Sequence, residues 1–457
     1  MHIAFVLLIL ALTASAHAAS PSMVATSPVS VPGFTHIREL AGIDEYRLDS
    51  NGLEILLKPD HSVPVVAYNV TYRVGSRNEA TGTTGATHIL EHMMFKGSEH
   101  YKKALGNDIS HFLEQVGGVY NATTSLDRTN YYEIVGRDSL SGVVPIEADR
   151  MRNLLLREED RRAEMTVVRN EYERGENSPA STLDKEVRAS AYEALPYHHS
   201  TIGWLSDIEN VPIEKLREFY DTFYWPDNAT VVIVGDFEPQ ATLELVTKYY
   251  GAYPHAPKPI PQLYTEEPPQ TGARRVTVKR PGSLGEVLIA HKVPNVRDAD
   301  APAVEVLDTI LARGKTSRLY RALIDKNLAT SVHAESTDSH DLSLNEIGAQ
   351  LAPGVRHSEV ERTLLAEIER VKEGGVTPDE LAIAKRELHT DSVFGRDDAA
   401  AIAAELNEWI AVGDWTLYTR YPEAIERVTA SDVQRVARQY LNEDQSTTGW
   451  FVPVSAK

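Results

Sequence analysis

Cysteine is absent from this chain of 457 residues. Disulfide bonds and thiolate chemistry are therefore excluded, and any metal site must be built from His, Asp and Glu side chains. Positive charge is also scarce, since 46 Lys and Arg stand against 66 Asp and Glu and the formal net charge is −20. A chain of this charge repels the phosphates of nucleic acids and anionic lipid surfaces. We therefore expect no nucleic-acid partner.

Long apolar runs are missing after the amino terminus, so no later segment is expected to span a membrane as a helix. The apolar run at the amino terminus, Ile3–Leu12, is followed by two Ala-x-Ala sequences within residues 14–18. This layout is typical of a cleaved secretory signal, here residues 1–18, whereas a retained anchor would need about 20 apolar residues. We expect an exported protein, periplasmic in a Gram-negative source, with no membrane association once the signal is removed.

The length of the chain predicts more than one domain, because a single hydrophobic core stops growing at roughly 250 to 300 residues. Residues 253–274 are dense in proline and carry no apolar period, which is typical of a linker. We therefore place one domain at residues 36–252, called the first half below, and another at residues 275–457, called the second half.

The two halves resemble each other. The segment from Val211, VPIEKLREFYDTFYWPDNATVVIVGDF, predicts a helix, a turn and an apolar strand, and the segment from Val428, VTASDVQRVARQYLNEDQSTTGWFVPV, has the same order. Earlier in each half a strand, a helix and a turn with Gly and Lys recur, AYNVTYRVGS…HILEHMMFKGS and VLIAHKVPNV…VEVLDTILARGKTS. Both halves are therefore predicted to be copies of one α+β unit. Only the first copy has histidines on this helix, so only the first half is expected to bind a metal.

The sequence HILEH in the first half sets two histidines four residues apart. Its surroundings predict a helix over about residues 85–96, ended by Gly97. On this helix His88 and His92 lie one turn apart, so that two imidazole nitrogens can reach one ion at ~2.0 to 2.1 Å. Glu91 would lie beside the ion without binding it, where a general base for a metal-bound water belongs. The alternative is a pair of surface histidines on an ordinary amphipathic helix.

A third ligand has to come from another element, and the best source is residues 157–176, whose composition favours a helix. Glu164, Val168 and Glu171 recur at i, i+4 and i+7 and form one stripe of that helix. Two carboxylates on a stripe with apolar neighbours favour a bound cation, and either of them could be the ligand. Glu173 lies about 200° around the helix from Glu171 and is expected to face solvent.

Further segments follow in order: FKGSEHY after the helix, NATTSLDRTNYYEI at residues 121–134, VVRNEYERGENSP, HHSTIG at residues 198–203 and VGD at residues 234–236. Together with HILEH and the two acids they resemble the inverted zinc motif and its accompanying segments in the pitrilysin (M16) family of peptidases. The resemblance covers nearly all of the mature chain and fits the short bacterial two-domain type, similar to the mitochondrial processing peptidase β subunit. It implies two homologous α/β-sandwich domains (LuxS/MPP-like), each a mainly antiparallel sheet with helices packed on it.

The resemblance also implies the roles of the site residues. His88, His92 and Glu171 would hold one Zn2+ ion, and Glu91 would activate a water for hydrolysis of a peptide bond. Glu164 would steady a histidine or the helix. The implied activity is that of a zinc metalloendopeptidase acting on peptides or small unfolded polypeptides in an enclosed cavity.

Substrate contacts follow from the same resemblance. The edge of the strand near Asn121 and Ala122 would pair with the backbone of a peptide substrate, which gives affinity with little demand on its sequence. The alternative for Asn121 is that it only ends a strand or satisfies a turn.

One departure from the family concerns the second half. Active members carry an Arg and, seven residues later, a Tyr that meet the substrate across the cavity. Here Leu323 or Ile324 and Thr330 stand in those places. Nearby basic and aromatic residues on the preceding helix are interpreted as surface and packing residues: Arg318, Tyr320 and Arg321.

We therefore predict a heterodimer in which this chain is the catalytic subunit and a related M16-like partner supplies the Arg and Tyr pair. A homodimer is the alternative. A different alternative is a non-catalytic scaffold or binding subunit with structural zinc, but Glu91 favours catalysis, because a structural site has no use for a positioned base. Processing of one precursor and degradation of short peptides stay open.

Overall fold

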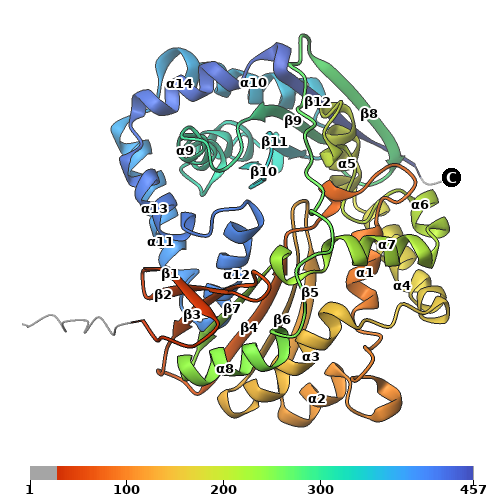
Figure 1. The fold of residues 1–457 in the computed structure, drawn as a ribbon. Helices are drawn as coiled ribbons and strands as arrows, with labels where there is room; N and C mark the ends of the chain where they lie inside the picture. Colours follow the sequence, from red (N-terminus) through yellow and green to blue (C-terminus); the bar gives the residue numbers. More distant parts are fainter. Residues whose placement is uncertain (1–27, 456–457) are drawn as a thin grey trace, which may run out of the picture.

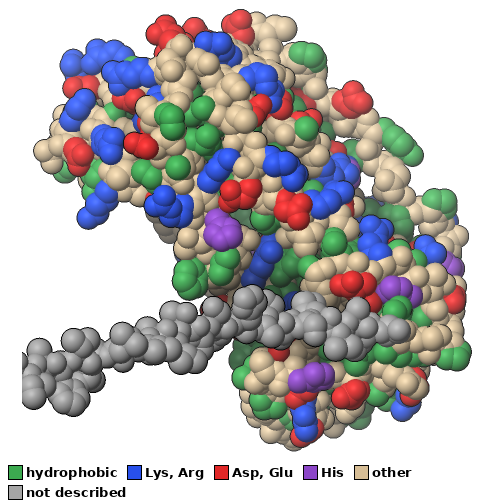
Figure 2. All heavy atoms as spheres, turned by 90° about the vertical axis from the view of Figure 1, so that its left-hand side faces the viewer, with side chains coloured by type: hydrophobic (Ala, Val, Ile, Leu, Met, Phe, Trp, Pro, Cys, Tyr) green, Lys and Arg blue, Asp and Glu red, His purple; other side chains and the backbone are tan. Residues whose placement is uncertain are grey.

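The computed structural model describes residues 28–455, so the expected signal peptide at residues 1–18 lies outside the described residues. Two β-sheets with helices packed on them make up the fold, which confirms the α+β class (Figure 1). Within residues 28–455 no helix is long and apolar enough to cross a membrane. Acidic and basic side chains are interspersed over the upper part of the face in Figure 2, a pattern typical of a solvated surface.

The first sheet has strands in the order β1-β2-β3-β7-β4-β6-β5. Their bounds are β1 (Phe34–Leu40), β2 (Ile43–Leu48), β3 (Glu54–Pro59), β4 (Val65–Tyr72), β5 (Val119–Thr124), β6 (Thr129–Gly136) and β7 (Ala229–Gly235). Neighbouring strands are antiparallel except β3 and β7, which run parallel. This order leaves β5 at one edge of the sheet.

The second sheet repeats this plan in the order β8-β12-β9-β11-β10. Its strands are β8 (Arg274–Pro281), β9 (Glu286–Val293), β10 (Ala329–Ser336), β11 (Ser343–Leu351) and β12 (Ser446–Val454). β8 and β12 run parallel, and the other neighbours are antiparallel. Strands β3-β7-β4-β6-β5 of the first sheet have the same relations, which confirms the predicted repetition of one α+β unit.

The helices of the first half are α1 (Ala86–Met93), α2 (Ile109–Val116), α3 (Leu140–Arg152), α4 (Glu158–Glu176), α5 (Pro179–Ala191), α6 (Leu205–Asn210), α7 (Ile213–Phe223) and α8 (Pro239–Tyr250). Those of the second half are α9 (Ala301–Ala312), α10 (His357–Gly374), α11 (Pro378–Phe394), α12 (Ala399–Ala411), α13 (Leu417–Arg427) and α14 (Ala430–Tyr440). The predicted helices that carry the candidate ligands are confirmed as α1 and α4. These two helices pack against each other, and α1 also contacts β5.

Two helices cross from one half to the sheet of the other. α5 of the first half packs on β8, β9 and β12, and α12 of the second half packs on β4 and β7 (Figure 1). The sequence of α12, AAAIAAELNEWIA, is rich in alanine, which allows a close approach to the sheet. An apolar cluster accordingly joins Ile43, Leu56 and Val232 of the first sheet to the core of the second half. The domain limits at residues 36–252 and 275–457 stay a prediction. Both α5 and α12 pack across the boundary between these two ranges.

Candidate metal centre

Helix α1 is anchored at its first turn by a carboxylate from the preceding loop. Its N-cap residue, Gly85, has a φ of +85°, and a Cβ there would lie 2.4 Å from the carbonyl oxygen of Ile202, so glycine is required. Glu79 accepts hydrogen bonds from the backbone N–H groups of Gly85 and Thr87 at 2.8 and 2.7 Å. These contacts determine where the helix begins and therefore which way its histidines point.

The two histidines of α1 meet a glutamate from α4. Nε2 of His88 lies 3.3 Å from Nε2 of His92 and 3.6 Å from Oε2 of Glu171, and Nε2 of His92 lies 3.5 Å from the same Oε2. Ligands bound to zinc at ~2.0 to 2.2 Å in tetrahedral geometry lie about 3.4 Å apart. Within the described residues no other group of three His, Cys, Asp or Glu side chains is close enough to share an ion. The donor atoms and their spacing therefore fit zinc.

The environment of the two imidazoles differs. Burial and the neighbouring His92 lower the pKa of His88 to about 4, so this ring is neutral at neutral pH. Burial would also lower the pKa of His92, but the hydrogen bond to Glu164 and the charges of Glu171 and Glu91 raise it. Because a metal ion binds the deprotonated nitrogen, an ion between the rings would hold both in the neutral form.

Glu164 supports the cluster without joining it. Its Oε1 lies 2.9 Å from Nδ1 of His92, which places the proton of that ring on Nδ1 and leaves Nε2 free for an ion. Its other oxygen pairs with Lys96. Burial would raise the pKa of Glu164, but its bonds to His92 and Lys96 lower it. Glu173, by contrast, is exposed and pairs with Arg169 on the surface of α4.

Glu91 lies next to the cluster and is only 9% exposed. Its Oε2 accepts a hydrogen bond from the hydroxyl of Thr124, the last residue of β5. The sequence patterns did not point to Thr124, although it lies within the motif NATTSLDRTNYYEI. Burial raises the pKa of the Glu91 carboxyl. A raised pKa suits a group that takes up a proton during a reaction and returns it.

The two predicted substrate-binding residues lie on β5, the edge strand that contacts α1. Ala122 is buried, whereas Asn121 is exposed, and the side-chain oxygen of Asn121 accepts the backbone N–H of Ala122 at 2.9 Å. The structure therefore brings the edge of the sheet close to the helix that carries His88 and His92. Pairing of a peptide with this edge stays a prediction.

Comparisons with known proteins identify the family of the chain. The family model described as Insulinase (Peptidase family M16) matches residues 54–203, and the model described as Peptidase M16 inactive domain matches residues 210–388. The zinc protease PqqE of Helicobacter pylori is 32% identical over 408 residues, which cover 88% of this chain and 91% of that protein. The chain belongs to peptidase family M16. The resemblance based on the motifs is thereby confirmed.

Further similar proteins cover most of this chain. The probable mitochondrial-processing peptidase subunit beta of Arabidopsis thaliana is 25% identical over 424 residues, which cover 88% of this chain and 77% of that protein. A crystal structure of a protease from Helicobacter pylori has a TM-score of 0.86 and 31% identity, over 91% of this chain and 100% of that one. The periplasmic protease PqqL of Escherichia coli has a TM-score of 0.73 over 92% of this chain and 48% of that one, and its 17% identity shows the fold alone.

The positions at which the resemblance predicts an Arg and Tyr pair lie in the second half and hold other residues. Leu323 is fully buried, and Thr330 is exposed on β10 with its hydroxyl donating to the side chain of Gln350 at 2.8 Å. Arg318 is held within its own half, since its guanidinium pairs with Glu380 of α11 at 2.7 Å. The side chains of Thr330 and Arg318 are thus engaged in contacts within the second half.

The second half does keep a counterpart of the HILEH helix. Glu305, Asp308 and Thr309 of α9 precede Gly314 by nine, six and five residues. His88, Glu91 and His92 precede Gly97 by the same numbers of residues, in the same order. Helix α9 contacts β10 as α1 contacts β5, and each of these strands lies at one edge of its sheet. The imidazoles are thus replaced by a carboxylate and a hydroxyl at equivalent places of the M16 repeat.

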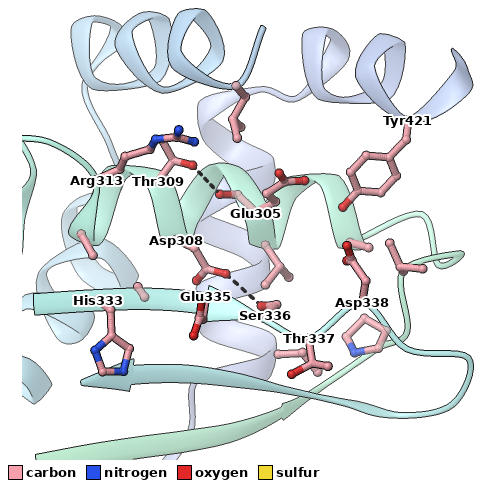
Figure 3. A pocket seen from close by; sticks show the side chains of 18 of the residues that line it. Glu305, Asp308, Thr309, Arg313, His333, Glu335, Ser336, Thr337, Asp338 and Tyr421 are labelled. Carbon is pink, nitrogen blue, oxygen red and sulfur yellow. Dashed lines mark hydrogen bonds between the residues drawn. The ribbon is translucent and has the colours of Figure 1, made fainter. Parts of the chain in front are cut away.

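These residues line a cavity of about 390 Å³ in the second half (Figure 3). Asp308 accepts a hydrogen bond from the hydroxyl of Ser336 at 2.8 Å, as Glu91 does from Thr124 in the first half. Burial raises the pKa of Asp308 and of Glu305 to about 7 in each case. The cavity is acidic, but within the described residues its carboxylates are too far apart to form a cluster of three metal ligands.

Asp308→Asn is expected to flatten the dependence of stability on pH. The folded pKa of about 7 exceeds the unfolded value, so the folded state binds more protons, and stability falls as pH rises from about 4 to above 7. Without this carboxyl, the loss of unfolding free energy between pH 5 and pH 8 should shrink by roughly 2 kcal/mol. Urea denaturation at both values measures it, with exposed Asp379→Asn as the control. An unchanged pH slope would contradict the assignment.

Proposed function

We propose that this chain is a zinc-dependent endopeptidase of the inverted-motif type, which hydrolyses peptides or small unfolded polypeptides. One observation carries the proposal: the triangle of His88 Nε2, His92 Nε2 and Glu171 Oε2, with sides of 3.3 to 3.6 Å, beside the buried carboxylate of Glu91. The relative named zinc protease PqqE supports Zn2+ as the ion.

The chemistry divides between the ion and the chain. His88, His92 and Glu171 would hold the zinc ion, which would lower the pKa of a bound water toward ~7 and polarise the carbonyl group of the substrate. Glu91 takes the proton of the attacking water and gives it to the leaving amine. Thr124 holds one oxygen of Glu91 and leaves the other for this transfer. Glu164 keeps Nε2 of His92 directed at the ion.

The proposal is tested by metal analysis and an assay on the same purified protein. We expect one zinc ion per chain, cleavage of an unstructured peptide at an internal bond, loss of cleavage after a chelator and its return on addition of zinc. Equal cleavage by the metal-free chain would contradict a zinc mechanism. Zinc binding without cleavage, alone or with a homologous partner, would favour the scaffold function instead.

Glu164→Gln is expected to weaken zinc binding by about 10- to 100-fold. A neutral amide in place of the carboxylate loses the charge that stabilises the proton on Nδ1 of His92 and loses the ion pair with Lys96. Titration against a chromophoric chelator measures the affinity. Glu159→Gln, an exposed acid in the first turn of the same helix, is the control. Equal affinity in wild type and Glu164→Gln would remove the supporting role.

We also propose export to the periplasm and assembly with a second M16-like chain. The apolar run with its Ala-x-Ala sequences supports export. The absence of an Arg and Tyr pair at Leu323 and Thr330 supports a partner, because a carbonyl oxygen that gains charge in the transition state needs a donor opposite the zinc.

The heterodimer predicts low activity of the isolated chain. Mixing it with a homologous partner exported by the same cell, one that carries the Arg and Tyr pair, should raise kcat/KM by about 10²-fold or more, the usual effect of a donor to the transition state. The partner's Arg or Tyr variants should not restore activity. Full activity of the isolated chain, unaffected by replacing Arg318, Tyr320 and Arg321 one at a time, would contradict this arrangement.

A further inference from the structure

An ion pair joins the second half to the strand next to the active site. Arg128 lies in the turn between β5 and β6 and is 7% exposed. Its Nε lies 3.1 and 3.3 Å from the two carboxylate oxygens of Glu408 on α12, and its NH2 group also donates to Glu408. The two residues are 280 positions apart in the chain. A paired guanidinium and carboxylate of this kind has a defined geometry as well as a charge attraction.

The remaining side of Arg128 holds the end of β5. Its NH1 group donates to the carbonyl oxygen of Thr123 at 3.1 Å, to the hydroxyl of Thr123 at 2.6 Å and to the side-chain oxygen of Asn130 at 3.0 Å. The turn is closed by a hydrogen bond from the backbone N–H of Ser125 to the carbonyl of Arg128 at 2.9 Å. The position of Thr123 is therefore coupled to α12 of the second half.

Thr124 follows Thr123 and points to the opposite face of the strand, where its hydroxyl donates to Glu91. We propose that Thr124, Arg128 and Glu408 are positioning residues through which the second half orients Glu91, an inference that rests on the proposed role of Glu91 as the base. A carboxylate held at one oxygen presents the other in a constant direction, which favours proton transfer from a water at a defined place.

A packing role alone is the alternative that an experiment has to exclude. In the second half Ser336 makes the same kind of hydrogen bond to Asp308, at 2.8 Å, without metal-binding histidines on the helix. A hydrogen bond from a strand hydroxyl to a helix carboxylate therefore also occurs in the half without the metal-binding histidines, where it joins β10 to α9. The readouts must distinguish the orientation of Glu91 from the stability of the fold.

The hydroxyl of Thr124 is tested with a matched pair of variants. Thr124→Val keeps the shape and removes the hydroxyl, and kcat for a peptide should fall roughly 10- to 100-fold with KM changed less than about twofold. Zinc content should stay at one ion per chain, and Thr124→Ser should restore most of kcat. Wild-type kcat in Thr124→Val, or equal kcat in the two variants, would overturn the proposal.

The contribution of the second half is tested with Glu408→Gln. Its kcat should fall roughly three- to tenfold, and the double variant with Thr124→Val should be close to Thr124→Val alone, because both act on Glu91 through one path. Glu405→Gln is the matched control, since Glu405 lies on the same helix and pairs with Arg396 within the second half. If the fold-decreases in kcat of the two single variants multiply in the double variant, the two residues act independently, and the proposed coupling of Glu408 to Glu91 through Thr124 is overturned.

A measurement on the metal-free chain is independent of turnover. Amide hydrogen exchange at residues 119–128 should be faster in Glu408→Gln and Arg128→Met than in wild type, and unchanged in Glu405→Gln. Unchanged exchange in Glu408→Gln would show that α12 does not hold β5 and would overturn the inference. Absence of cleavage by every form of the protein would contradict the proposed function, and the exchange rates would still decide whether Glu408 controls β5.

Discussion

Glu91→Gln is expected to lower kcat for peptide hydrolysis by about 10³-fold or more while one zinc ion stays bound per chain. Glutamine has nearly the shape of glutamate and can still accept the hydrogen bond of Thr124, so α1 keeps its geometry. It has no basic oxygen that takes a proton from water. Initial rates with a fluorogenic peptide and elemental analysis of the same sample measure both quantities.

The two readouts separate the possible roles of Glu91. Loss of zinc together with activity would make it a ligand, and full activity would show that another group acts as the base. Glu114→Gln, a replacement of an exposed acid on α2, is the control for the loss of one negative charge. It should match wild type in rate and in zinc content.

Glu171→Gln is expected to weaken zinc binding by well over about 10²-fold, more than the loss of a supporting residue costs. Its Oε2 lies 3.6 and 3.5 Å from the two histidine Nε2 atoms, and a neutral amide oxygen is a much poorer ligand for zinc than a carboxylate. Glu173→Gln removes an acid two residues along that is exposed and paired with Arg169. This control should bind zinc as wild type does.

Thermal unfolding gives a readout for Glu171→Gln that does not depend on catalysis. An ion that binds only the folded chain raises its stability in proportion to the logarithm of the ion concentration over the Kd. Zinc should therefore raise the Tm of wild type and of Glu173→Gln, and leave that of Glu171→Gln nearly unchanged. Equal zinc content and equal Tm shifts in wild type and Glu171→Gln would show that another side chain is the third ligand.

The pair of histidines on one face of α1 could be predicted because a helix brings residues four apart together. Helix periodicity did not determine which carboxylate of α4 is the better candidate for the third ligand. Glu164 and Glu171 share one stripe of that helix, so spacing alone left both as candidate ligands. The packing of α4 against α1 separates them, since Glu171 lies within reach of both Nε2 atoms and Glu164 contacts Nδ1 of His92.

The repeat of strands and helices was also visible in the amino-acid order, and the matching order of the two sheets agrees with it. The exchange of α5 and α12 between the halves was not. An amphipathic pattern shows that a helix buries one face, but it does not show which sheet receives that face. The alanine-rich face of α12 packs on β4 and β7, far from its neighbours in the chain.

Four features are determined by the amino-acid sequence alone. The net charge and the absence of cysteine are properties of its composition, the HILEH helix depends on spacings within one element, and the repeated unit is visible as two similar segments. The contact of Thr124 with Glu91 and the pairing of Arg128 with Glu408 arise only in the folded chain. They join residues 33 and 280 positions apart, and their formation depends on how a strand edge, a helix and the two halves pack. No local period encodes that arrangement, since many sequences with the same periods could place these side chains elsewhere.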